Sequence, residues 1–169
     1  MISLTKFFRK LIGKTNKSEN IFIKLFIISI IVGIVYGVVD QNYYKCCESD
    51  LDVQEGENVL TIFSSNLLLS RIEYLTAGIS SIYINFNTFA TASSYLHFQN
   101  ALYVLPFLFI HGFPELLGAL LFSLAGLSLL ERKFLKRKSN LKWFTLLKYG
   151  TVFLIIAAAI EIGLFYLLS

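Results

Sequence analysis

The 169-residue chain is 56% hydrophobic and 15% charged, and it carries a net charge of +4. With a mean hydropathy of +0.66, this composition excludes an ordinary soluble domain and predicts an all-α, polytopic transmembrane helical bundle. The basic residues lie in short stretches beside apolar runs, as juxtamembrane anchors do, so we expect the lipid bilayer and no nucleic acid as a partner.

The first twenty residues form a basic segment that we expect on the cytoplasmic side. Apolar residues recur in it at helical spacing with lysines and an arginine between them, which predicts an amphipathic helix lying on the anionic inner leaflet. These apolar residues are Leu4, Phe7, Phe8, Leu11 and Ile12. A disordered basic tail is the alternative for residues 14–20.

Residues 21–39 form the first predicted span, nineteen residues in which Lys24 can extend its amine toward the cytoplasm. Gly33 and Gly37 stand four apart, a spacing of small residues that allows another helix to approach closely. We therefore expect helix packing on that face.

Residues 40–58 form an acidic connector, with six acids and one base between Asp40 and Glu57. The positive-inside rule places this connector outside the cell membrane. Cys46 and Cys47 are adjacent and could pair only in a strained ring, and no metal-ligand spacing surrounds them. We interpret both as incidental thiols, with a redox or cross-linking role as the alternative.

Residues 59–80 and 82–98 are the second and third predicted spans. They contain Asn66 and Arg71, which we expect to join an intramembrane polar cluster, and Glu73, which on a helix cannot face Arg71. Serine, threonine and asparagine side chains in this region could bond across helices or around a water-filled cleft.

Residues 101–130 form an apolar run that contains His111-Gly-Phe-Pro-Glu115. A straight helix of this length would cover roughly 45 Å, more than the hydrocarbon core of about 30 Å. We therefore expect a helix break, for which the candidates are Pro106, Gly112 and Pro114. Beyond the break, Gly118 and Gly126 are candidates for close helix packing.

A basic inner loop at residues 131–142 and a last span at residues 144–168 complete the chain. The loop is expected to orient the chain in the membrane, with docking of a cytoplasmic protein as the alternative. Glu161 lies in the last span, at a height above the loop similar to that of Glu115, roughly 24 Å at 1.5 Å per residue. We expect His111, Glu115, Glu161, Asn66 and Arg71 to form the polar cluster.

Five spans, at residues 21–39, 59–80, 82–98, 101–130 and 144–168, predict a cytoplasmic N-terminus and an extracytoplasmic C-terminus. No phosphate-binding loop, two-histidine zinc motif or serine–histidine pair with a glycine-flanked nucleophile is present in the sequence. We therefore expect a protein with no catalytic residues, no metal and no cofactor.

Two motifs resemble those of the stage II sporulation protein M family of integral membrane proteins. His111-Gly-Phe-Pro-Glu115, followed by Leu124-Ala-Gly126-Leu, is similar to the family's His-Gly-x-x-Glu helix. Ala158-Ala-Ile-Glu161 is similar to its last-helix element, and Asn66, Gly78 and Asn87 are weaker matches. The resemblance covers about residues 59–168. Ile110 stands where the family often has proline, and the chain is short for the sporulation members.

The resemblance implies a non-enzymatic membrane subunit of a multi-protein complex. Short family members accompany the maturation, export and immunity of circular bacteriocins, beside another membrane protein and an ATP-binding cassette ATPase. We expect that context, with other membrane subunits, the ATPase and a hydrophobic peptide as partners in a bacterial cell membrane. The alternatives are a sporulation or cell-wall-remodelling membrane protein and a stand-alone transporter or channel.

Overall fold

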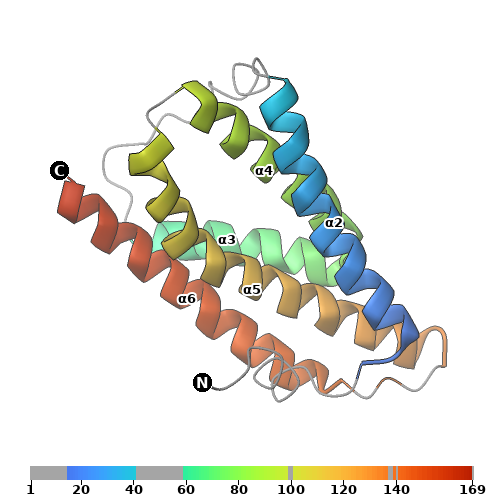
Figure 1. The fold of residues 1–169 in the computed structure, drawn as a ribbon. Helices are drawn as coiled ribbons and strands as arrows, with labels where there is room; N and C mark the ends of the chain where they lie inside the picture. The colour runs from blue at the N-terminus through green and yellow to red at the C-terminus, as the bar shows by residue number, and fades with distance from the viewer. Residues whose placement is uncertain (1–14, 41–58, 99–100, 137–138, 140, 169) are drawn as a thin grey trace, which may run out of the picture.

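The computed structural model describes residues 15–40, 59–98, 101–136, 139 and 141–168. In these residues the chain forms five helices and no strand (Figure 1), which confirms the predicted all-α class. The helices are α2 (Lys17–Val39), α3 (Val59–Leu75), α4 (Ile79–Phe98), α5 (Ala101–Lys133) and α6 (Trp143–Leu168). The predicted amphipathic helix, most of the acidic connector, Cys46 and Cys47 lie outside the described residues.

Three helical segments are long and apolar enough to cross a membrane: Lys17–Val39, Gly112–Lys133 and Trp143–Gly163. On α2, apolar side chains such as Ile31 and Val35 are 54% and 57% exposed. An apolar surface on long helices is what lipid-facing segments require, so the chain is a membrane-embedded protein. Within the described residues of α3 and α4, no segment has the same combination of length and hydropathy.

Helix α2 packs along α4 through its two glycines. A Cβ on Gly33 would lie 2.6 Å from the carbonyl oxygen of Phe86, and one on Gly37 would collide with the carbonyl of Ala90 and the hydroxyl of Ser93. Because Gly33 faces Phe86 and Gly37 faces Ala90, the two helices run in the same direction. The four-residue spacing of Gly33 and Gly37 therefore allows the close approach of another helix, here α4, that the sequence predicts.

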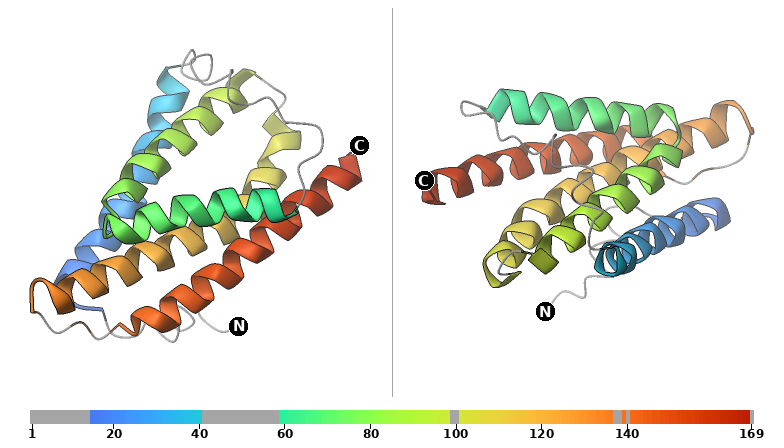
Figure 2. Two further views of the ribbon diagram at one scale, coloured as in Figure 1. Left: turned by 180° about the vertical axis from the view of Figure 1, so that it is seen from behind. Right: turned by 90° about the horizontal axis from the view of Figure 1, so that it is seen from above.

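Helix α5 packs antiparallel to α6. A Cβ on Gly118 would lie 2.8 Å from Leu154, and one on Gly150 would lie 2.7 Å from Phe122. From the first contact to the second, the residue number increases on α5 and decreases on α6, so the two helices are antiparallel. Seen from above (Figure 2, right), α3 and α2 lie on opposite sides of the layer that contains α5.

The predicted helix break at Pro106, Gly112 and Pro114 is wrong. Helix α5 continues without interruption from Ala101 to Lys133, although it bends between its yellow first part and its orange second part (Figure 1). A proline inside a helix removes one backbone hydrogen bond and clashes with the preceding turn, which can bend the helix without ending it. Where water is absent, the other backbone N–H and C=O groups have no alternative partners, so the rest of the helix keeps its hydrogen bonds.

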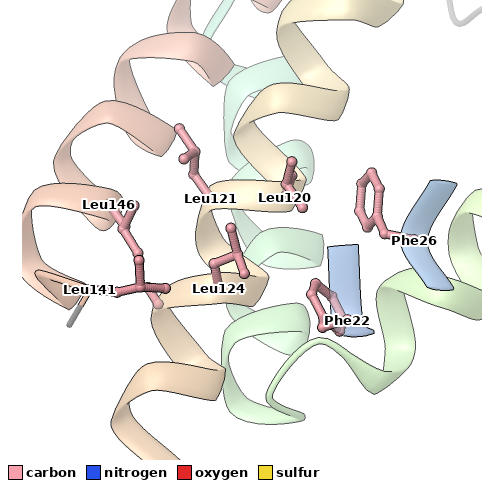
Figure 3. Close-up of a cluster of buried hydrophobic side chains, with 8 residues drawn as sticks. Phe22, Phe26, Leu120, Leu121, Leu124, Leu141 and Leu146 are labelled. Atoms are coloured by element: carbon pink, nitrogen blue, oxygen red, sulfur yellow. The ribbon is translucent and has the colours of Figure 1, made fainter. Parts of the chain in front are cut away.

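The core forms where α2, α5 and α6 meet. Phe22 and Phe26 of α2 point toward α5, and leucines of α5 and α6 fill the other side (Figure 3). Leu120, Leu121 and Leu124 come from α5, Leu146 comes from α6, and Leu141 comes from the loop just before α6. Gly78, with a φ of +85°, ends the turn between α3 and α4, and a Cβ there would lie 2.5 Å from the Phe22 ring. The core thus holds the α3–α4 turn against α2.

Candidate functional site

Polar side chains gather where α3 lies beside α5. On α3, Asn66, Ser70 and Glu73 follow one another at intervals of four and three residues, which places them on one helix face. Ser70 and Glu73 are buried, and Asn66 is half-buried. The α3 helix of a membrane-embedded chain therefore has a buried face that is largely polar.

Helix α5 contributes Glu115 and Ser123 to this contact. A Cβ on Gly126 would collide with the backbone carbonyl of Tyr74, so α3 and α5 touch backbone to backbone at that level. Ser123, one turn before Gly126, is fully buried. Glu115 lies eleven residues, or about three helical turns, before Gly126 and therefore on the same face of α5. We call Asn66, Ser70, Glu73, Glu115 and Ser123 the α3–α5 polar interface.

Glu73 is the central side chain of this interface. Only 2% of its surface is exposed, and its Oε2 atom has no hydrogen-bond partner in the described part of the chain. Its backbone is held in place, because the Glu73 carbonyl accepts hydrogen bonds from the Gly78 amide at 2.7 Å and the Thr76 hydroxyl at 3.3 Å. Glu115 lies near enough to interact electrostatically with Glu73.

The residues of the predicted polar cluster occupy different environments. Glu115 and Glu161 are half-buried, as is Asn66, whereas the side chain of Arg71 is exposed. His111 lies within α5, one turn before Glu115. The register set by Gly118 and Leu154 brings Glu161 of α6 to about the level of His111. The buried charged residue of α3 is Glu73, which the predicted cluster does not include.

A second polar group joins the start of α2 to the end of α5 and the loop that follows it. Asn16 caps α2. Its side-chain Oδ1 accepts a hydrogen bond from the backbone N–H of Glu19 at 2.9 Å, and its backbone N–H donates to Glu19 Oε2 at 2.6 Å. Its Nδ2 also donates to Glu131 Oε2 at 2.7 Å, across 115 residues of sequence. The Ser139 hydroxyl donates to Glu19 Oε1 at 2.6 Å. We call Asn16, Glu19, Glu131 and Ser139 the cap cluster.

The two carboxyl groups of the cap cluster are buried. Glu19 is 0% exposed, Glu131 is 1% exposed, and Glu131 Oε1 is buried without a hydrogen-bond partner in the residues that the structure describes. The Arg132 guanidinium donates to the carbonyls of Ser139 and Leu141 at 2.8 and 2.6 Å, which fixes the loop next to the carboxylates. The spacing Asn16-x-x-Glu19 is the sequence signal of such a capping box, although it was not among the features predicted from the sequence.

In the described part of the chain, no three side chains of His, Cys, Asp or Glu are grouped so that they could hold a metal ion. The two polar groups differ in what they do for the molecule. Most carboxylate oxygens of the cap cluster accept hydrogen bonds, which is typical of a structural element. Glu73 Oε2 and Glu131 Oε1 are both unpaired within the described residues, but Glu131 is held through its other oxygen by Asn16. Glu73 lies in the contact between two helices, where a buried acid of a membrane protein is typical of a functional site.

No family model, curated protein or solved structure matches this chain.

Proposed function

We propose that this protein is a non-enzymatic membrane subunit of a multi-protein complex that matures or exports a circular bacteriocin, or confers immunity to it, together with an ATP-binding cassette ATPase. The sequence motifs centred on His111, Glu115 and Glu161 suggest this context. The observation in the structure that supports it is the α3–α5 polar interface, a buried polar surface inside a chain whose long helices suit a membrane. A hydrophobic peptide is the cargo expected of such a complex.

We also propose that all five helices cross the membrane, with the N-terminus in the cytoplasm. Three segments have the necessary length and hydropathy, and α3 and α4 would cross while packed against them. The parallel pairing of α2 with α4 and the antiparallel pairing of α5 with α6 suit an alternating path across a bilayer. The basic residues after Glu131 favour the cytoplasm for the α5–α6 loop.

Co-purification tests the proposed complex. The tagged chain, extracted in a mild detergent from cells that express its neighbouring genes, should co-elute with an ATPase subunit. A matched variant with Lys133→Gln and Lys136→Gln, both exposed, should retain the ATPase, because we assign these charges to membrane orientation. If the variant instead loses the ATPase, and does so only at high salt, the loop is a docking surface for the ATPase.

A stand-alone transporter is the second candidate, because a buried carboxyl group between helices is also what a substrate or ion pathway uses. The two candidates predict different results for the purified chain. Peptide or ion transport by the chain alone in liposomes, with no ATPase bound in cells, would overturn the subunit proposal. A sporulation or cell-wall-remodelling role would be favoured by a gene neighbourhood that lacks a bacteriocin precursor and an ATPase.

A further inference from the structure

The buried carboxyl group of Glu73 lacks the partners that usually accompany a charge in a protein interior. Its side chain is 2% exposed and its Oε2 accepts no hydrogen bond in the described part of the chain. A buried polar oxygen without a partner requires a ligand, a water molecule or a proton on the group itself. The nearest acidic group on a neighbouring helix, Glu115, adds negative charge to the site.

No basic side chain among the described residues neutralises Glu73. Arg71 on the same helix, Lys24 on α2 and Lys148 on α6 all have exposed side chains. On α5, Arg132 donates to the Ser139 and Leu141 carbonyls. His111 belongs to the turn of α5 before Glu115, and its side chain is not among those that the structure describes. On α6, Glu161 is a further acid, and on α4 the side chain of Tyr83 is exposed.

The backbone around Glu73 prevents the side chain from reaching water by a small adjustment. Tyr74, the next residue, touches α5 through its carbonyl at Gly126. The Glu73 carbonyl closes the turn to Gly78, whose Cα packs against the Phe22 ring and the Ser123 side chain. The Ser123 hydroxyl is itself buried and unpaired within the described part of the chain. Two unpaired polar side chains thus flank one tight helix contact.

We propose that Glu73 is a proton-binding site inside the helix bundle, where the carboxyl group takes up and releases a proton as α3 moves relative to α5. With α3 closed on α5, the neutral acid avoids a charge in an apolar interior and next to Glu115. Opening this contact admits water, which hydrates the carboxylate and accepts the proton. Glu73 thereby couples protonation to the packing of α3 on α5. The same coupling would serve a subunit of a complex or a transporter.

Labelling with dicyclohexylcarbodiimide tests this site, because the hydrophobic reagent reacts with protonated carboxyl groups that water does not reach. The full chain in detergent is treated at about neutral pH, and the adduct is located by peptide mass spectrometry. We expect an adduct on Glu73 that is absent from Glu73→Gln. Once the group ionises, labelling should fall about tenfold for each further unit of pH.

Two controls make the result decisive. Glu131→Gln removes another buried carboxyl group and should leave the adduct on Glu73 unchanged, while helix content and elution volume report whether each variant folds. Absence of an adduct on Glu73 at every pH in the folded wild-type chain would overturn the proposal and favour a hydrated carboxylate. Protection by sodium ions at constant pH would also overturn it, because sodium would then be the occupant.

Discussion

At the scale of single residues, Asn16 has two roles, one within α2 and one between α2 and α5. It satisfies the first turn of α2 and at the same time holds Glu131, the last acidic residue of α5. The Glu19 side chain bonds in turn to Ser139, 120 residues away in sequence. One short polar segment therefore ties three parts of the chain together.

Replacing Asn16 with alanine should destabilise the protein by about 2–4 kcal/mol. Loss of an N-cap costs about 1 kcal/mol, and the buried Glu131 carboxylate would also lose a donor, which costs about 1–3 kcal/mol. Thermal unfolding of the purified protein in detergent measures the effect. The control is Asn20→Ala, which removes only an exposed bond from Thr15 and should change stability by less than about 0.5 kcal/mol. Equal losses in both variants would contradict the role of the cap cluster.

At the scale of elements, glycines decide which helices touch. Gly33 and Gly37 bring α2 onto α4, Gly118 and Gly150 bring α5 onto α6, and Gly126 brings α5 onto α3. A membrane helix gains little from burying apolar surface against another helix, so close backbone contact and dispersion must supply the association. The glycine positions are therefore the places where a single methyl group has the largest effect on packing.

Gly126→Ala should destabilise the chain by about 1–3 kcal/mol, because the added Cβ collides with backbone atoms of Tyr74 that cannot rotate away. Gly163→Ala is the matched control: nothing lies within 4 Å of its Cβ position, and alanine favours a helix by up to about 1 kcal/mol over glycine. Circular dichroism during heating in detergent compares the two. A neutral Gly126→Ala variant would show that α3 does not press on α5.

At the scale of the whole molecule, charge and hydropathy set the arrangement in the membrane. The basic residues that follow Glu131 and the basic residues before α2 lie at the ends of apolar helices, and the cap cluster joins these two ends. Both ends must therefore lie on one side of the membrane. The positive-inside rule favours the cytoplasm for that side, which supports the proposed topology.

Reporter fusions test this arrangement. A fusion within the loop at residue 136 should read as cytoplasmic, because seven basic residues lie from Arg132 to Lys148 inclusive. A fusion after Leu168 should read as extracytoplasmic, because α6 crosses once from that loop. Alkaline phosphatase and a cytoplasmic fluorescent reporter give opposite signals at the two sites. A cytoplasmic signal after Leu168 would mean an even number of spans and would contradict the proposed topology.

The sequence by itself was enough to predict the helical class, because apolar runs long enough to cross a bilayer have few alternatives to a helix. It also marked Gly33, Gly37, Gly118 and Gly126 as packing positions through their spacing and composition. The predicted break in α5 was wrong, because Pro106 and Pro114 favour a break only where the surroundings can satisfy the freed backbone groups. Helix α5 instead remains continuous and bends.

Tertiary structure alone decided which polar residues are buried. Glu73 and Arg71 are two positions apart on α3, and the sequence does not state which of them faces α5; the rotation of α3 about its axis buries Glu73 and exposes Arg71. The spacing of Asn66, Ser70 and Glu73 indicates one helix face, but only the contact with Gly126 identifies its partner. The cap cluster joins residues that are 115 and 120 positions apart. Such contacts depend on the relative placement of whole helices, which no local pattern determines.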